Sequence, residues 1–494
     1  MQVSVKTIAG FIQDLRKFLK PDQILNSPIE RYLYDTDATS LFKEEAALIV
    51  LPNNTHEISQ IIKLINQYCE DLPINFVARG AGTGLSGGAI GNAHSVIISI
   101  ARLNQLIAYD ETNQIALIET GLVNAALSEQ IKHTGLHFSP DPSSQDSCTI
   151  GGNIAENAGG IHCFKHGVTS EQILGLEIVL PSGEVIYTGT INAEACQKYD
   201  RGEEHHKIYS AKRSSIDLTK LFVGTEGTFG IATKALVRLQ AIPESFLTMQ
   251  LCFKSVSEAA ELVAAIIKHG FKPTAIEMID RGAIEAVSKT FELGVPSHTQ
   301  AVLLIELDGH NNEVLLEAKL IRELVEDKFI PIQYKETQDA QEKNFLWKVR
   351  KGTVAAFGQL APFWYLYDAV VPRSKIPEAL SSIARISEKY QLKLASVLHA
   401  ADGNLHPNFL YDPDKDPTVI ERIHQASHEI MKLCIALGGV LSGEHGIGIE
   451  KREYMPFMFS ETDMETMLKV RKIFDPKMIS NPDKIFPVRI CKEC

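Results

Sequence analysis

The chain has 494 residues, of which 45% are hydrophobic and 22% charged, and this is more than one hydrophobic core usually organises. The composition predicts at least two globular domains and excludes a largely disordered chain. A formal net charge of -12 disfavours nucleic acid or an anionic lipid surface as a partner. No window approaches about eighteen consecutive apolar residues, so the sequence predicts no direct membrane span.

The first apolar pattern, from Ile8 to Leu19, has helical spacing with basic residues in between. Asp14 and the lack of a small-residue cleavage site favour a helix of the first domain over a transit peptide. Eight scattered cysteines favour a reducing compartment, the cytoplasm. Cys491 and Cys494 form a terminal CxxC, which is by itself a weak sign of a metal or redox site.

Residues 45–240 are rich in glycine and contain short β-branched runs that are typical of strands. The predicted strands are Ala47–Leu51, Asn75–Ala78, Ser95–Ile98, Ile115–Glu119, Ile173–Leu180 and Ile231–Leu239. From residue 246 a regular rhythm follows, which predicts helices packed on one face of a sheet. Its strands are LTMQLCF, TAIEMI and AVLLIEL, and its helices are Val256–His269, Arg281–Thr290 and Glu313–Asp327.

The last 45 residues, with a helix predicted around Thr462–Phe474, are too few for a core of their own. We therefore expect an α+β protein with a first domain at residues 1–245, a second at 246–450, and a segment 451–494 that returns to the first.

Gly82, Gly84 and Gly87 spell GxGxxG after a predicted strand, which suggests a Rossmann fingerprint. That motif requires a helix to open on its glycines, and here another strand follows instead. The segment ARGAGTGLSGGAIG is therefore predicted to be a long loop whose amides form a nest for an anion such as a pyrophosphate. Two further segments, Pro140–Gly160 and Val223–Ile231, have the same character and predict further walls of one extended cofactor site.

These three segments resemble the FAD-binding domain of the vanillyl-alcohol oxidase and p-cresol methylhydroxylase superfamily. The order of motifs over nearly the whole chain is similar to the branch of the glycolate oxidase FAD subunit, D-lactate dehydrogenase and D-2-hydroxyglutarate dehydrogenase. The resemblance implies a two-subdomain FAD-binding domain of the p-cresol methylhydroxylase type, a ferredoxin-like α+β substrate (cap) domain, and a C-terminal helical segment on the FAD domain. It also implies noncovalent FAD, and no link to the nearby His162 or His166.

The resemblance assigns the FAD contacts residue by residue. The implied residues are Arg79, Gly80, Ala81, Gly82, Thr83 and Gly84 at the pyrophosphate, Ser144, Thr149, Gly152, Asn153 and Ile154 along the pyrophosphate and isoalloxazine, Glu226, Gly227 and Ile231 at the adenosine end, and Asn481.

The sharpest chemical signal is the pair of segments HAADGNLH, which starts at His399, and LSGEHGIG, which contains Glu444 and His445. AspGly is a preferred two-residue hairpin turn, and such a turn would set His399 directly opposite His406. Directly opposed β-carbons lie roughly 4.5 to 5.5 Å apart, so both imidazoles could bind one ion with Glu444 as a third ligand. For any single histidine a hydrogen-bonded core residue is the favoured interpretation, but four acidic or imidazole groups in two glycine-flanked turns favour a metal site.

The dehydrogenase branch has matching HxxDGNxH and GEHGxG motifs. The resemblance thus implies His399, His406 and Glu444 as ligands of a divalent metal, for which zinc, manganese and iron all remain open. It implies His445 as the general base, a role that suits the ordinary pKa of a histidine side chain, about 6.5.

Arg350, Thr353 and Phe357 share a helical face in WKVRKGTVAAF. A planar guanidinium grips a carboxylate well, although a surface arginine is the alternative. The resemblance implies that Arg350 and Thr353 belong to the catalytic site.

The strand-like segment WYLYDAVVP departs from the 2-hydroxyglutarate enzymes, which carry a lysine where Leu366 stands here. This predicts a small or apolar substrate such as glycolate or D-lactate, with Tyr365 or Tyr367 lining the pocket.

The predicted function is that of an FAD-dependent 2-hydroxy-acid dehydrogenase, with metal-assisted hydride transfer to flavin N5. The alternatives are a D-2-hydroxyglutarate-type dehydrogenase, a superfamily member that uses FAD without net oxidation of its substrate, and an electron-transfer subunit without a substrate of its own. An iron–sulfur or electron-transfer partner subunit and a homodimer are compatible with the resemblance. The expected location is the cytoplasm, or the inner membrane surface through such a partner.

Overall fold

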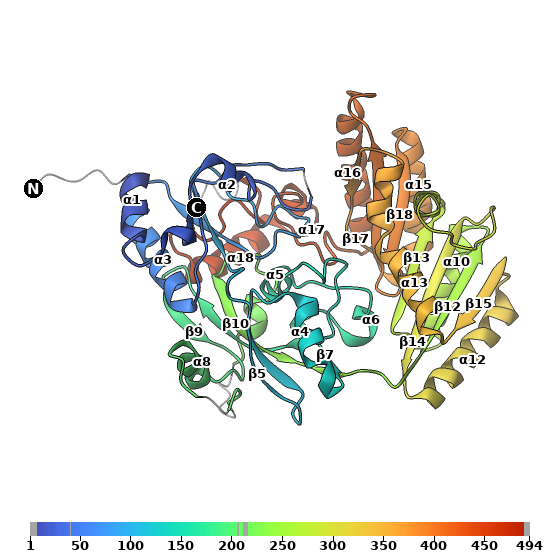
Figure 1. Ribbon diagram of the computed structural model, residues 1–494. Coiled ribbons are helices and arrows are strands. Elements are labelled where there is room, and N and C mark those ends of the chain that lie inside the picture. Colours follow the sequence, from blue (N-terminus) through green and yellow to red (C-terminus); the bar gives the residue numbers. More distant parts are fainter. Residues whose placement is uncertain (1–6, 40, 205–206, 211–215, 489–494) are drawn as a thin grey trace, which may run out of the picture. The chain divides into compact units, whose positions relative to one another are not determined.

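The computed structural model describes residues 7–39, 41–204, 207–210 and 216–488. The chain forms two compact units, and each is made of separate stretches of sequence (Figure 1). The first unit comprises Met1–Gly159, Val168–Ile242 and Glu444–Cys494, and the second comprises Gly160–Gly167 and Pro243–Gly443. The terminal CxxC lies outside the described residues.

A four-stranded sheet of the first unit has the order β1-β2-β4-β3. Strands β2 (Leu48–Val50), β4 (Ser95–Ser99) and β3 (Asn75–Arg79) run parallel, while β1 (Ile24–Leu25) pairs antiparallel with β2. Every residue of β2 and β4 is buried, as expected of parallel strands that are covered on both faces.

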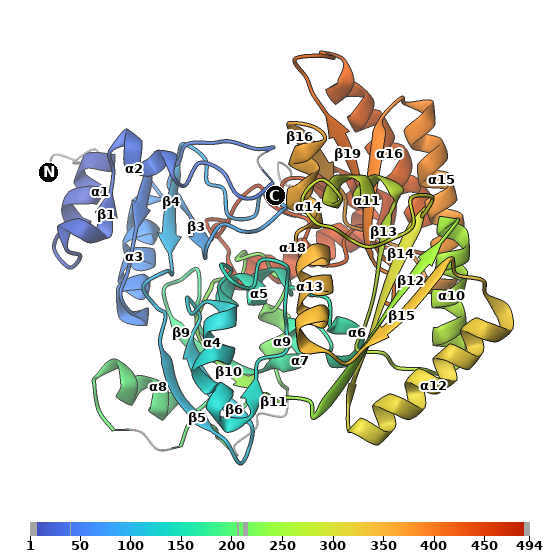
Figure 2. The ribbon, with the colours of Figure 1, turned by 45° about the vertical axis from the view of Figure 1, so that its right-hand side comes forward.

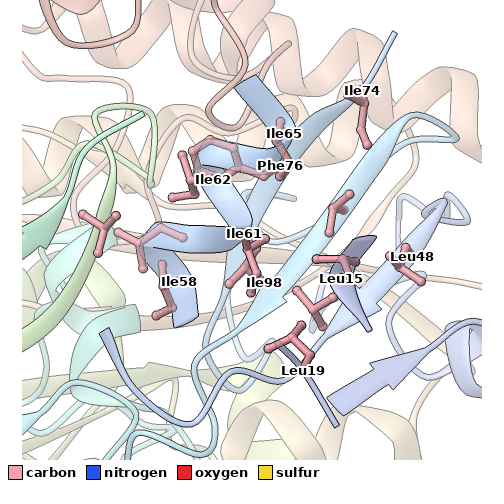
Figure 3. Close-up of a cluster of buried hydrophobic side chains, with 14 of the residues drawn as sticks. Leu15, Leu19, Leu48, Ile58, Ile61, Ile62, Ile65, Ile74, Phe76 and Ile98 are labelled. Atoms are coloured by element: carbon pink, nitrogen blue, oxygen red, sulfur yellow. The ribbon is translucent and has the colours of Figure 1, made fainter. Parts of the chain in front are cut away.

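Helix α3 (Thr55–Tyr68) covers this sheet with isoleucines at the spacing i, i+3, i+4 and i+7. Ile58, Ile61, Ile62 and Ile65 are fully buried and gather with side chains of the strands in one hydrophobic cluster (Figure 3). Full burial of one such side chain stabilises the fold by roughly 1.5 to 3 kcal/mol, so this helix anchors the sheet.

A five-stranded antiparallel sheet completes the first unit, in the order β5-β6-β10-β8-β9. Its strands are β5 (Leu106–Asp110), β6 (Ile115–Glu119), β8 (Ile173–Val179), β9 (Val185–Tyr187) and β10 (Ile231–Arg238). The six strands predicted between residues 45 and 240 are thus all present, each within one residue at either end.

The C-terminal segment adds to the first unit, as predicted. Residue Phe76 of β3 donates its N–H to the Ile479 carbonyl and accepts from the Asn481 N–H. The buried Arg471 in the last turn of the preceding helix α18 (Glu461–Phe474) donates to the Ser480 carbonyl. The remaining helices and short strands of this unit are α1 (Ile8–Leu15), α2 (Pro28–Tyr32), α4 (Asn124–Ile131), α5 (Ile150–Glu156), α7 (Thr169–Gln172), α8 (Ala193–Asp200), α9 (Thr219–Phe222), α17 (Met455–Met458), β7 (Leu136–His137) and β11 (Gln240–Ala241).

The second unit is built on an eight-stranded sheet with the order β15-β12-β14-β13-β18-β19-β16, and β17 pairs with β19. All of these pairings are antiparallel. The strands are β12 (Ser245–Phe253), β13 (Ala275–Asp280), β14 (Ala301–Gly309), β15 (Gln333–Thr337), β16 (Phe363–Leu366), β17 (Ala369–Val370), β18 (Lys393–His399) and β19 (Asn404–Tyr411).

Helices cover both faces of this sheet, so the prediction of helices on one face is wrong. Helices α11 (Arg281–Val287), α13 (Ala340–Lys351) and α14 (Thr353–Ala356) share a core with one face, and α10 (Val256–Lys268), α12 (Asn311–Lys328) and α15 (Ile376–Lys389) lie on the other (Figure 2). The physical reason is visible in β14, where every residue from Ala301 to Leu307 is buried and both faces need cover. The unit also contains α6 (Cys163–His166) and α16 (Val419–Ala436).

None of the described helices combines the length and the apolar character that a bilayer crossing needs.

Candidate functional site

The loop between β3 and β4 contains the first glycine segment, and no helix follows it, as predicted. A Cβ on Gly80 would lie 2.3 Å from Thr149 Oγ1, so only glycine allows this close approach. Thr149 in turn caps α5 by accepting the Gly152 N–H at 3.1 Å. The first and the second predicted segments therefore meet at Gly80 and Thr149.

The third segment is hydrogen-bonded to the second segment. The N–H groups of Gly224 and Glu226 donate to the carbonyls of Ile154 and Ala155 at 2.8 Å each. The Asn481 side chain donates to the carbonyls of Gly88 and Glu226 at 2.9 and 2.6 Å. Segments far apart in the sequence are thus joined around one region of the first unit.

Two buried amide groups in this region lack a hydrogen-bond partner among the described residues, namely Asn153 Nδ2 and Asn481 Oδ1. Buried polar atoms usually have partners, so these two indicate a polar ligand. A donor and an acceptor beside glycine-rich backbone fit the phosphate, ribose and ring groups of a dinucleotide. Ala81 is exposed and the glycine-loop residues Gly82, Thr83 and Gly84 are half-buried, which leaves that backbone accessible to such a ligand.

The Arg79 side chain is hydrogen-bonded within the protein. Its guanidinium donates to the carbonyls of Tyr34, Thr36 and Ala89 at 3.3, 2.9 and 3.2 Å, and burial lowers its pKa. Its side chain therefore holds the glycine loop against an earlier segment, and its contact with a pyrophosphate stays a prediction.

The Glu226 carboxylate is likewise engaged within the first unit. It accepts the N–H groups of Ile447 and Gly448, both at 2.7 Å, and burial raises its pKa although these donors oppose the shift. Glu226 thus holds the loop that follows Glu444 and His445, a role that the sequence did not indicate. Ile231 belongs to the hydrophobic cluster of the first unit, and the Gly227 carbonyl accepts the Ser480 hydroxyl at 2.7 Å.

In the second unit, β18 and β19 form the predicted hairpin, but the predicted register is wrong. His399 opposes Asn404, and His406 opposes Val397, so the loop has the four residues 400–403. A two-residue AspGly turn would need positive φ at both positions, whereas only Gly403 has it, with φ +77°. The Asp402 N–H donates to the His399 carbonyl at 3.1 Å, which closes a wider turn.

The shift is two residues, and side chains alternate with period two, so His399 and His406 still share a face. Their ring centroids lie 5.2 Å apart, and each offers a ring nitrogen within 4.8 Å of the other. His399 Nδ1 lies 2.8 Å from Glu277 Oε1, and His406 Nδ1 lies 2.8 Å from the Tyr367 carbonyl. These acceptors place the proton on Nδ1, so Nε2 of each ring is the candidate ligand atom.

Asp368 is a buried acid beside this pair that the sequence reasoning missed. It offers an oxygen within 4.8 Å of a His406 ring nitrogen, and accepts the Ser442 hydroxyl and the Gly443 N–H at 2.6 and 3.0 Å. A Cβ on Gly443 would lie 2.6 Å from Asn404 Nδ2. The chain is thus fixed against the hairpin at Gly443, one peptide bond before Glu444. An acid within an apolar strand segment was the only sequence signal for Asp368.

Arg350 is buried, with 4% of its side chain exposed, so it is not the surface arginine of the alternative interpretation. Its Nη2 forms an ion pair with Glu277 Oε2. The two groups are not aligned as a hydrogen bond, and Nε and Nη2 have no hydrogen-bond acceptor among the described residues. A buried guanidinium in this state suits a carboxylate ligand. Thr353 is also buried, and its hydroxyl donates to the Val349 carbonyl at 3.0 Å.

The expectation that Tyr365 or Tyr367 lines the pocket is wrong for Tyr367. Its hydroxyl contacts Ser427 of α16, and its ring packs on Phe409 at 5.4 Å, on the sheet face opposite to His406. Tyr365 packs on Tyr367 at 4.8 Å.

His162 and His166 lie in the stretch Gly160–Gly167, which belongs to the second unit. His162 Nε2 lies 3.6 Å from Glu306 Oε1, and His166 Nε2 lies 4.0 Å from Asp308 Oδ2. Both imidazoles therefore face acids of β14.

Two family models match the chain. The FAD binding domain matches residues 46–189, and the C-terminal domain of FAD linked oxidases matches residues 242–485. The glycolate oxidase subunit GlcD of Escherichia coli (strain K12) is 34% identical over 473 residues, which is 96% of this chain and 90% of that protein. GlcD of Bacillus subtilis (strain 168) is also 34% identical, over 94% of each chain.

A D-lactate dehydrogenase of Anaerostipes hadrus is 28% identical over 90% of each chain. The solved structure of p-cresol methylhydroxylase with substrate bound is similar in fold, with a TM-score of 0.78 and 16% identity over 97% of each chain. With its two matching domain models and full-length relatives, the chain belongs to the family of FAD-linked oxidases and is an FAD-dependent oxidoreductase.

Proposed function

We propose that this protein oxidises a small D-2-hydroxy acid, glycolate or D-lactate, to the 2-oxo acid, with the help of a divalent metal. One observation carries the proposal: two imidazoles on one sheet face, each with Nδ1 hydrogen-bonded, lie next to a buried arginine whose Nε and Nη2 have no hydrogen-bond acceptor among the described residues. The relatives named as glycolate oxidase subunits and D-lactate dehydrogenases support the substrate class.

The residues that would hold FAD are those of the three glycine segments, with Asn153 and Asn481 supplying a donor and an acceptor. The metal would be held by His399, His406 and Glu444. Two imidazoles and one carboxylate are a common ligand set for catalytic zinc and for iron, and they leave open positions for substrate. Glu444 is proposed as the third ligand because it supplies the carboxylate of the LSGEHGIG segment.

When bound, FAD would accept the C2 hydride, which carries both electrons, and the metal would polarise the hydroxyl that is to be oxidised. Arg350 binds one carboxylate oxygen of the substrate through the N–H groups that lack acceptors. His445, next to Glu444, is the proposed general base that takes the hydroxyl proton. Thr353 lies one helical turn after Arg350 and is the second proposed catalytic residue of this segment.

A small substrate follows from Leu366 at the edge of the hairpin. Leu366 opposes Asn408, which shares a sheet face with His406, so an apolar side chain stands where the 2-hydroxyglutarate enzymes have a lysine. A second substrate carboxylate would find no counter-charge at this position. GlcD is named as a subunit, and we extend this to a partner subunit that receives the electrons here.

The direct test mixes the purified flavoprotein anaerobically with glycolate, D-lactate or D-2-hydroxyglutarate and follows the flavin absorbance. Glycolate or D-lactate should bleach the flavin, and D-2-hydroxyglutarate should do so more weakly. If none of the three bleaches it, the proposed function is wrong.

A second test replaces His399 by Ala. Metal content should fall below half of the protein concentration while FAD stays bound, because this histidine belongs to the second unit and the glycine segments to the first. His424→Ala, at an exposed histidine of α16, is the matched control and should keep the metal. Joint loss of metal and flavin in His399→Ala would show a structural histidine.

A further inference from the structure

Glu277 on β13 touches both halves of the candidate substrate site. It is the directly opposed partner of His399 on β18, and its Oε1 lies 2.8 Å from His399 Nδ1. Its other oxygen, Oε2, forms the ion pair with Arg350 of α13. The side chain is 1% exposed, so water does not compete for either contact.

The contact with His399 decides which nitrogen of that ring binds a metal. A carboxylate oxygen accepts hydrogen bonds, so the contact with Glu277 Oε1 places the His399 proton on Nδ1. Nε2 then has the lone pair, and the ring is held in one orientation. Such acceptors behind a metal-binding histidine typically raise metal affinity by about 10- to 100-fold.

The contact with Arg350 has the opposite consequence for an anion. Glu277 neutralises a buried guanidinium that would otherwise stand without a counter-charge. A substrate carboxylate must therefore share Arg350 with Glu277, and Nε, which has no hydrogen-bond partner among the described residues, is left for it. The Glu277 carboxylate is thus expected to raise the affinity for the metal and to lower the affinity for the anion.

We propose that Glu277 is a positioning residue that orients His399 toward the metal and weakens the binding of the substrate carboxylate by Arg350. This inference rests on the proposed function, because it assumes that His399 is a ligand and that Arg350 binds the acid. Moderated binding of the carboxylate would favour release of the 2-oxo acid, which carries the same group.

Glu277→Gln tests both halves in the purified flavoprotein. Its amide oxygen cannot accept from both partners, and the negative charge is gone. We expect the Kd for Zn²⁺, measured by competition with a fluorescent chelator, to rise about 10- to 100-fold. The Kd for propionate, a carboxylate without a hydroxyl, should fall about tenfold when it is titrated calorimetrically into metal-depleted protein.

Two further variants complete the experiment. Glu277→Asp keeps the charge but withdraws the carboxylate by one methylene, so the Kd for Zn²⁺ should rise at least about fivefold while propionate binding is retained. Glu306→Gln is the matched control, because Glu306 is equally buried on the same sheet face and accepts from Lys343 at 2.8 Å. It should bind Zn²⁺ like the wild type.

An unchanged Kd for Zn²⁺ in Glu277→Gln, or in Glu277→Asp if the first variant does not fold, would overturn the inference. A joint loss of zinc and propionate affinity would also overturn it, since damage to the fold weakens both. If the wild-type protein binds metal and is reduced by a hydroxy acid, these outcomes leave the proposed function intact. A wild-type protein that does neither would overturn the proposed function and this inference with it.

Discussion

Two buried ion pairs, Lys234–Glu177 in the first unit and Arg350–Glu277 in the second, differ in how their cations are satisfied. In the first unit, Lys234 Nζ contacts Glu177 Oε1 at 2.7 Å, Thr55 Oγ1 at 3.0 Å and Asp200 Oδ1 at 2.8 Å. In the second unit, Arg350 forms an ion pair with Glu277, and within the described part of the chain neither Nε nor Nη2 has a hydrogen-bond acceptor.

From this difference we interpret the Lys234 pair as structural and the Arg350 pair as functional. Burial opposes the charge of Lys234, yet the charges of Glu177 and Asp200 outweigh it and raise its pKa, so the protein itself completes this site. The protein leaves Arg350 incomplete, although unsatisfied buried donors cost stability. We infer that the incomplete cation is kept for a ligand.

The largest effect should come from breaking the satisfied pair. Lys234→Met leaves the Glu177 charge buried without its cation, so the free energy of unfolding should fall by about 3 to 5 kcal/mol in urea denaturation. The KM of the folded protein for the hydroxy acid should not change. Adding Glu177→Gln should restore much of the stability, and an unchanged unfolding midpoint in Lys234→Met would contradict the comparison.

Arg350→Ala should give the reverse pattern, with loss of function exceeding loss of stability. Removal of a charge-assisted contact with the substrate should lower kcat/KM by about 30- to 1000-fold, or about 2 to 4 kcal/mol. Arg322→Ala, which removes a half-exposed arginine from its pair with Glu336 in the same unit, is the control and should keep kcat/KM. Wild-type turnover of Arg350→Ala at low substrate would refute a binding role.

A smaller effect, dependent on pH, is expected at Asp308. Burial raises its pKa, but contacts with His166 and Lys165 outweigh burial and hold the pKa below its ordinary value of 3.8. A depressed pKa means that the stabilisation is complete above the ordinary value and is lost as the pH falls through the folded value. Asp308→Asn should lower the free energy of unfolding by about 1.5 to 3 kcal/mol at pH 7.

That difference between wild type and Asp308→Asn should shrink below pH 3.8 and should not change above about pH 5. Urea denaturation across this range checks it. A difference that persists at low pH would show that the contacts of Asp308 do not depend on its charge.

Much of the fold was readable from local sequence. Apolar runs predicted six strands of the first unit within one residue, and the spacing of HAADGNLH placed His399 and His406 on one sheet face. The helical spacing around Arg350 also held, although the helix is interrupted at Gly352. These features depend on the periods of single strands and helices, which a sequence displays directly.

Other features needed partners from distant parts of the chain. Glu277 lies 122 residues before His399, and Asp368 lies 75 residues before Gly443, so no local spacing links them. The register of the hairpin depended on backbone angles at Asp402, and the cover on both sheet faces depended on which helices return to it.

The amino-acid sequence by itself determined the family and the cofactor and predicted the side chains of the proposed metal site, because glycine-rich loops and short histidine motifs are local features. The tertiary structure alone decided which side chains are satisfied and which are left for a ligand. Hydrogen bonds and charges act over a few ångströms in space, and residues far apart in the chain become neighbours only when the sheets assemble.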